Sequence, residues 1–176
     1  MCQAHRITIH DEHPFRPPDD ERDPLRRFRG RMPAPVTLWA AGAGAARVGL
    51  TVSSVLVADG DPAVLLGLVD EDSAFWDEQP DVFTVALVAP GQEYLADVFA
   101  GTVPAPGGAF TLGTWEQTAW GPVLQGTAGW LGVRRLPGEP RHAGWAVLVE
   151  GVVEQVELGE PDSLAHVRGR YRDLQH

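Results

Sequence analysis

The sequence predicts a mainly β protein whose antiparallel strands form a closed or nearly closed barrel. About six segments are rich in β-branched and aromatic residues, whereas only one or two short segments have helical periodicity. Helices do not separate the strands regularly, as they would in a doubly wound α/β sheet. The 20 glycines and 15 prolines supply the many turns that such a fold needs.

Four of the expected strands lie in the first half of the chain. Residues 35–41 are β-branched and aromatic, and a second run of this kind covers residues 47–57 before the Asp-Gly-Asp-Pro turn at 59–62. Residues 63–69 are short and apolar, which predicts a strand buried on both faces. Residues 81–88 alternate between polar and apolar and predict a fourth strand.

After residue 88 the spacing of the apolar residues changes from that of a strand to that of a helix, and two longer strands follow the helix. Residues 92–100 predict a helix that Gly101 ends. Its expected common face consists of Tyr94, Leu95, Val98 and Phe99. Residues 126–136 alternate around Trp130 and Val133, and residues 145–158 are dominated by valine, so both are expected to be strands with a turn at 137–140 between them.

The N-terminal residues differ in composition from the rest. Residues 1–24, rich in charge and proline, are expected to form a flexible or draped arm, and residues 25–176 a single domain that begins with a short helix near 24–31. The arm contains His5, His10 and His13 beside two acids, but their spacing is not that of a structural zinc site. We therefore expect no metal.

Composition also excludes several classes of function. The net charge of −10 repels polyanions, so neither nucleic acid nor an anionic membrane is an expected partner. No apolar run reaches the ~20 residues of a membrane-spanning helix, and residues 1–30 lack the apolar stretch of a signal peptide. The single Cys2 fits a reducing cytoplasm. All 14 basic residues are arginines, so any phosphate must be bound by arginine, hydroxyls or main-chain N–H groups.

Small hydroxyl residues mark the most informative segment, Gly-Leu-Thr-Val-Ser-Ser at 49–54. In an extended strand, Thr51 and Ser53 would point to one face, and Val52 and Ser54 to the other. Such a row can hydrogen-bond the ring of a flat ligand that lies close to the backbone. The alternative is that these hydroxyls only cover a solvent-facing strand.

Two further segments could bind an anion. Asp72 or Ser73 could cap a short helix and leave its first N–H groups free, although an ordinary capped turn explains the same pattern. Three arginines alternate at positions 168, 170 and 172, either as an anion-binding strand face or as a solvated one.

Nine short motifs occur in an order that is fairly specific as a set. They are RMPAPVT (31–37), GLTVSS (49–54), DPAVLL (61–66), DEDSAF (70–75), FTVAL (83–87), LADVFAG (95–101), GPVLQG (121–126), VEGVV (149–153) and RGRY (168–171). With these motifs the chain resembles the flavin reductase-like family, which has the FMN-binding split-barrel fold. The resemblance covers roughly residues 25–174.

The resemblance implies a homodimer that binds FMN, less often FAD, near the subunit interface and receives a hydride from NAD(P)H. It also implies a set of cofactor-binding positions. Those bordering the flavin ring are Pro33, Ala34 and Pro35; those hydrogen-bonding the ring and ribityl chain are Thr51, Val52, Ser53 and Ser54. The positions at the flavin phosphate are Asp72 and Ser73. The positions that approach the cofactor at the end of the helix are Phe99, Ala100 and Gly101, and the positions in the closing motif near the site are Arg168 and Tyr171.

Two positions depart from the family pattern. Many reductases of this kind have Gly-Asp-His before the penultimate long strand, with the histidine near the nicotinamide, but this chain reads His142-Ala-Gly-Trp145. Either His142 has moved along the loop or Trp145 replaces the histidine, so the catalytic residues are unknown and these two are candidates. The phosphate motif has Asp-Glu-Asp where relatives often have a basic residue.

The leading hypothesis is an NAD(P)H-dependent FMN reductase, with a monooxygenase as a candidate partner. The alternative is an FMN-binding protein with little reductase activity, a flavin carrier or electron relay. In a third interpretation the chain is a purely structural β domain. Among the tryptophans, Trp120 and Trp145 are the candidates for stacking on a flat ring.

Overall fold

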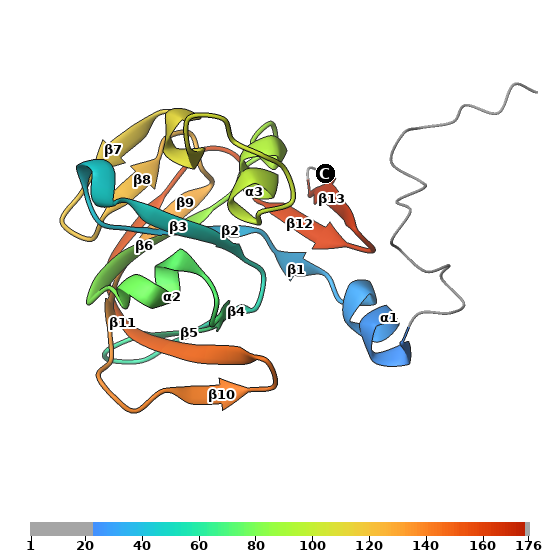
Figure 1. Ribbon diagram of the computed structural model, residues 1–176, viewed down its shortest axis with the longest axis horizontal. Helices are drawn as coiled ribbons and strands as arrows, with labels where there is room; N and C mark the ends of the chain where they lie inside the picture. Colours follow the sequence, from blue (N-terminus) through green and yellow to red (C-terminus); the bar gives the residue numbers. More distant parts are fainter. Residues whose placement is uncertain (1–22, 175–176) are drawn as a thin grey trace, which may run out of the picture.

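One curled antiparallel sheet forms most of the protein. The computed structural model describes residues 23–174 (Figure 1). The sheet has the strand order β3-β2-β6-β9-β11-β5-β4, and β10 pairs with β11 outside that path. These strands are β2 (Thr37–Ala41), β3 (Val48–Val52), β4 (Val55–Ala58), β5 (Val64–Asp70), β6 (Val82–Leu87), β9 (Gly129–Arg135), β10 (Arg141–Ala143) and β11 (Ala146–Leu158). The mainly β split-barrel prediction is confirmed.

Smaller elements cover the sheet. A three-stranded sheet has the order β1-β12-β13, and β7 pairs with β8. The remaining elements are α1 (Pro24–Arg31), β1 (Ala34–Pro35), the 3-10 turn η1 (Gly44–Ala46), α2 (Ala74–Glu78), α3 (Glu93–Phe99), η2 (Ala109–Thr111), β7 (Trp115–Gln117), β8 (Pro122–Leu124), β12 (Leu164–Val167) and β13 (Arg170–Asp173). In Figure 1, α1 and the β12–β13 hairpin stand to one side of the barrel.

The strand expected over residues 47–57 is two strands, because the chain changes its partner midway. Before the break β3 pairs with β2, and after it β4 pairs with β5 at the other end of the sheet. Residues 53–54 form the corner between them. The main-chain carbonyl of Ser54 accepts a hydrogen bond from the N–H of Leu68 (3.0 Å), and Thr37 Oγ1 donates to the carbonyl of Val52 (2.5 Å). The corner therefore brings the two ends of the sheet together.

An aromatic cluster fills the barrel. Trp39 is fully buried and stacks on Phe83, with ring centroids 5.0 Å apart, and Phe75 of α2 meets both rings edge to face. In Figure 1, α2 lies between β3 and β5, where it carries Phe75 into the interior. A second cluster packs α3 against the other face of β2, through residues such as Leu38 and Leu95.

Three features differ from what the sequence predicted. The strand expected at 63–69 is not buried on both faces, because Leu65 and Val69 face the core while Leu66 and Leu68 line a groove at the surface. The short strand β10 was not expected, since its residues carry no β-branched pattern, and pairing with the start of β11 forms it. Tyr94 is 56% exposed, although the other members of its expected helical face are buried.

The short helices end as their sequences predict. The helix expected at Pro24–Arg31 is present and has no buried residue. At the end of α3, Gly101 has φ +69°, and its N–H bonds to the carbonyl of Val98 while that of Thr102 bonds to Asp97. This Schellman motif requires a left-handed residue, which explains the glycine. Within residues 23–174 no helix is long and apolar enough to cross a membrane.

Candidate functional site

A cavity of about 860 Å³ lies beside the C-terminal end of α3, and we call it the α3 cavity. Three parts of the chain line it: residues 44–51, which carry η1 and most of β3; the end of α3 together with residues 107–111 around η2; and the end of β5 and start of α2, with Asp70 and Ser73. Its walls include two aromatic rings, Phe99 and Phe110, whose centroids lie 5.0 Å apart. The cavity therefore combines flat apolar surface with a few polar groups, as small-molecule sites do.

Five of the expected flavin-binding residues line the α3 cavity, namely Thr51, Ser73, Phe99, Ala100 and Gly101. Thr51 Oγ1 donates to the carbonyl of Ala96 (2.7 Å) and thereby ties β3 to α3. Ser73 Oγ donates to the carbonyl of Asp70 (2.6 Å) and accepts the N–H of Trp76 (3.2 Å), so Ser73 caps α2 as expected. Both hydroxyl protons are bound by main-chain carbonyls, so each of these oxygens can act toward a ligand only as an acceptor.

A second cavity, of about 790 Å³, lies between α1 and the β4–β5 end of the sheet, and we call it the α1 groove. Five other expected residues line it, namely Pro33, Ala34, Pro35, Ser53 and Ser54. Ser54 Oγ donates to the carbonyl of Leu68 (3.3 Å). His166 and two arginines of α1 also line the groove. The expected row of hydroxyls is thus divided between two cavities, because the chain turns at residues 53–54.

Four expected cofactor-binding residues line neither cavity. Val52 belongs to the barrel core and is 3% exposed. Asp72 is exposed in the turn before α2, and its N–H bonds to Asp70 Oδ1 (3.0 Å). Arg168 occupies the β12–β13 turn with φ +53°, and its N–H donates to the carbonyl of Gly30 in α1. The fourth residue is Tyr171.

Tyr171 fastens the C-terminal hairpin to α3. Its hydroxyl donates to Asp97 Oδ1 (2.6 Å), and its ring packs edge to face with His166 at 5.3 Å. Partial burial, followed by the bond to Asp97, raises the pKa of Tyr171 above its usual range. The phenol therefore stays protonated and acts here as a structural donor.

The two catalytic candidates lie on the β10–β11 hairpin. Trp145 is 95% exposed in its turn, and His142 Nδ1 lies 3.6 Å from Glu71 Oε2 on the surface. Neither side chain lines the α3 cavity or the α1 groove. The register pairs Ala146 with Asp70, which does line the α3 cavity, so this turn lies near the cavity rim.

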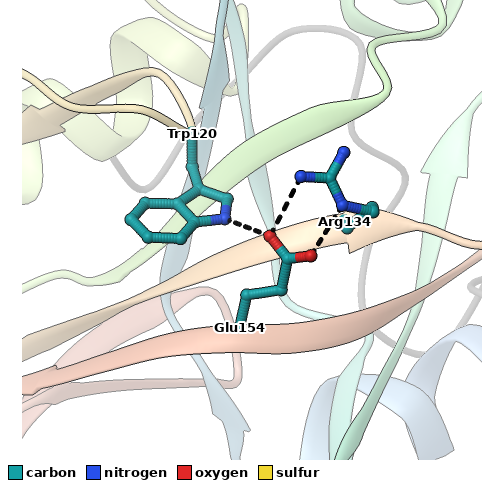
Figure 2. A network of polar contacts seen from close by, with 3 residues as sticks. All are labelled: Trp120, Arg134 and Glu154. Atoms are coloured by element: carbon teal, nitrogen blue, oxygen red, sulfur yellow. Dashed lines mark hydrogen bonds and ion pairs between the residues drawn. The ribbon is translucent and has the colours of Figure 1, made fainter.

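Trp120, the other tryptophan considered for stacking on a flat ring, packs instead against the outer face of the sheet. Figure 2 shows Glu154 accepting the Trp120 indole N–H (2.8 Å) and two bonds from the Arg134 guanidinium. Glu154 sits where a bulge interrupts the pairing of β11 with β9. The Trp120 ring lies directly over Gly132, where an added Cβ would come within 2.4 Å of it. Trp120 is therefore a packing residue, outside both cavities.

The Glu154 network also shifts two protonation equilibria. Hydrogen bonds from Arg134 and Trp120 lower the pKa of the Glu154 carboxyl, and the hydrogen bond and charge of Glu154 raise the pKa of Arg134. Both groups are accordingly charged at neutral pH, and the ion pair fixes the loop that carries Trp120 across the sheet.

Sequence reasoning missed Arg47. This residue lines the α3 cavity, and its guanidinium carbon lies 6.0 Å from the centre of the Phe110 ring. It is the single basic residue between Arg31 and Arg134 in the sequence, and that isolation in an acidic chain was the signal available. Within residues 23–174 no cluster of three or more histidines, cysteines and acids could bind a metal, and the N-terminal histidines fall outside that range.

Comparisons with known proteins agree on one family and one fold. A model of the flavin reductase-like domain matches residues 29–175. The NADH:FAD oxidoreductase SgcE6 of Streptomyces globisporus C-1027 has a TM-score of 0.75 at 24% identity, over 86% of this chain and 91% of that one. The flavin reductase PheA2 has a TM-score of 0.76 at 21% identity, over 86% and 97%.

A third solved structure is BorF, the flavin reductase component of a bacterial two-component tryptophan halogenase. Its TM-score is 0.74 at 23% identity, over 86% of this chain and 97% of that one. At these identities the structures establish a common fold. No curated protein sequence matches the chain significantly.

Proposed function

Because the chain belongs to the flavin reductase-like domain family and is an oxidoreductase of that type, we propose that it is an NAD(P)H-dependent flavin reductase that uses FMN. The α3 cavity is the single observation that carries this proposal. Its volume of about 860 Å³ lies within the usual range for small-molecule sites, and it combines Thr51, Ser73 and aromatic walls. Five of the positions at which the family resemblance implies flavin contacts line this cavity.

The residues present fit a flavin nucleotide in chemical type. Aromatic and backbone surface at Phe99 and Gly101 suits a flat ring, and the lone pairs of Thr51 and Ser73 suit the N–H and hydroxyl donors of a flavin. When bound, the flavin supplies the electron-accepting chemistry, and the chain supplies binding, orientation and exclusion of water. A protein acid or base is not required for that step, which fits the lack of a histidine lining the α3 cavity among the described residues.

The nicotinamide donor remains part of the proposal. The β10–β11 turn with Trp145 lies near the rim of the α3 cavity, and an exposed indole offers a flat surface for a nicotinamide. Among the solved structures, SgcE6 has also been seen in complex with NAD and FAD fragments. FAD therefore stays an alternative flavin for this chain.

We also propose a homodimer in which α1 contacts the second copy. Leu25 and Phe28 lie one turn apart on α1, Met32 directly follows the helix, and the three side chains are 64%, 66% and 55% exposed. Leu56 of the edge strand β4 is 70% exposed and lines the α1 groove. Apolar residues on both sides of the groove favour burial against another protein surface. Sedimentation of Phe28→Ser beside the unaltered protein tests this: a monomeric variant supports it, and a monomeric parent protein contradicts it.

The fate of the reduced flavin is proposed by analogy. BorF belongs to a two-component halogenase, and another similar structure is component B of a nitrilotriacetate monooxygenase. We infer that this chain passes reduced flavin to a partner monooxygenase in the cytoplasm. Stimulation of a candidate oxygenase by the purified chain, FMN and NADH tests that inference.

A flavin carrier or electron relay is the second candidate function. The departure from Gly-Asp-His favours it, as does the placement of His142 outside both cavities beside Glu71. Anaerobic titration with NADH and then NADPH separates the two functions. Bleaching of the bound flavin supports the reductase and identifies the donor. A yellow protein that neither nucleotide bleaches supports the carrier, and a colourless protein that takes up no FMN rejects both.

A further inference from the structure

Arg47 occupies a defined place in the α3 cavity. It follows η1 directly, and its side chain enters the cavity wall beside Phe110. Arg47 is the one cation and Asp70 the one carboxylate among the described residues that line this cavity. Asp70 is exposed, and one of its carboxylate oxygens accepts the N–H of Asp72. The positive charge of Arg47 is therefore not matched by a neighbouring acid.

The hydrogen bonds of Arg47 leave a donor unused. Its Nη2 donates to Gln117 Oε1 (3.2 Å), and the amide nitrogen of Gln117 donates to the carbonyl of Gly42 (3.1 Å). Together these two bonds hold the guanidinium in place. Its Nε is buried and makes no hydrogen bond to any residue from 23 to 174. A buried N–H of a charged group without an acceptor is costly, and the described residues thus leave part of the hydrogen-bonding capacity of this guanidinium unused.

The absence of a carboxylate partner sets Arg47 apart from two other arginines in the described part of the chain. Arg134 pairs with Glu154 and Arg141 with Glu150, whereas no ion pair between described residues involves Arg47. Its guanidinium instead lies 6.0 Å from the centre of the Phe110 ring, a neighbour that stabilises a cation without neutralising it. The planar fork of an arginine is well suited to phosphate oxygens.

We propose that Arg47 binds a phosphate ester of the nucleotide in the α3 cavity and so makes the site selective for phosphorylated ligands. This inference rests on the proposed function, which puts a flavin nucleotide in that cavity. It also accounts for a chain that has no lysine and carries three acids at the turn before α2. The cation that phosphate binding requires comes from the start of β3 instead of that turn.

The test compares flavins with and without phosphate. Titration of the flavin-free protein with FMN and with riboflavin gives a dissociation constant for each. We expect Arg47→Gln to weaken FMN binding about tenfold or more and to change riboflavin binding less than about twofold, since only the charged hydrogen bonds to phosphate are lost. Arg47→Lys keeps the charge without the fork and should fall between. Arg141→Gln, an equal charge change outside both cavities, is the matched control.

Equal weakening of FMN and riboflavin by Arg47→Gln would overturn the inference, as would unchanged FMN binding together with an unchanged KM for NADH. If Arg47→Gln leaves the affinity for FMN unchanged and raises the KM for NADH, then Arg47 binds a phosphate of the nicotinamide nucleotide and not that of the flavin. Pyrophosphate separates this inference from the proposed function. If the parent protein binds pyrophosphate and Arg47→Gln does not, Arg47 is an anion site even where no flavin binds. If neither binds it and flavin is not taken up, both proposals fail.

Discussion

Gly67 and Trp39 make the contact that most directly tests the architecture. Gly67 lies on β5 and Trp39 on β2, which are separated in the sheet by β6, β9 and β11 and meet across the barrel. A Cβ on Gly67 would lie 2.4 Å from Trp39 Cη2 and 2.5 Å from Cζ2, about 1 Å inside ordinary contact. Trp39 is 0% exposed, stacks on Phe83, and donates its indole N–H to Thr37 Oγ1 (3.1 Å). It therefore has little freedom to move away.

We expect Gly67→Ala to lower the free energy of unfolding by about 2–3 kcal/mol, toward the upper end of overpacking penalties. Trp39→Phe deletes the two ring atoms that the new methyl would strike, and alone should cost about 2 kcal/mol for the cavity and the lost bond to Thr37. In the double variant the methyl enters the space that the smaller ring leaves. Its loss should fall short of the sum by at least ~1 kcal/mol.

Urea unfolding followed by far-UV circular dichroism measures all three variants, with a common slope against urea as the check on comparability. Gly138→Ala is the matched control, because its Cβ would have nothing within 4 Å, and it should change stability by less than ~0.5 kcal/mol. Losses that add to within ~0.5 kcal/mol in the double variant would mean that Trp39 and Gly67 do not touch, and the closure of the barrel described above would be wrong.

Four other predictions concern the site and its supports. Ser53 lines the α1 groove and not the α3 cavity, so Ser53→Ala should leave FMN binding unchanged in a fluorescence titration, and a loss of ~1 kcal/mol or more would place the flavin at the α1 groove instead. Trp145→His should raise the rate of flavin reduction in stopped-flow experiments if the indole fills the place of the family histidine; an identical rate counts against that alignment. Glu154→Gln should lower thermal stability at pH 7, and the difference should disappear in acid, because the pKa of Glu154 is lowered and its contribution is lost as pH falls through that value. Tyr171→Phe should cost about 1 kcal/mol near pH 8. Since burial and Asp97 raise the pKa of Tyr171 above its unfolded value, the advantage of the tyrosine should shrink above pH ~10, where the unfolded chain ionises; a difference that persists at pH 11 would contradict this assignment.

The local sequence pattern was enough to place most strands, the start of α2 and the end of α3. The Schellman motif at Gly101 and the cap at Ser73 depend on residue types at fixed offsets, so one sequence reveals them. The break at residues 53–54 was not visible, because β-branched residues continue on both sides and only the choice of partner strand changes there. Periodicity describes burial along one element and contains no information about which other element is adjacent.

The candidate site was foreseen as a set of positions and not as a shape. Thr51 and Ser53 were expected on one face, but the corner sends the first to the α3 cavity and the second to the α1 groove. Trp120 is a candidate for stacking on a flat ring by sequence, yet its ring packs over Gly132 and its indole N–H is bound by the carboxylate of Glu154. Both outcomes depend on contacts between residues far apart in sequence.

The corner at residues 53–54 links the geometry of the two cavities. Thr51 belongs to the wall of one and Ser53 to the wall of the other, with Val52 anchored in the core between them. Any substitution that shifts the backbone at Val52 would therefore displace a wall of each cavity at once.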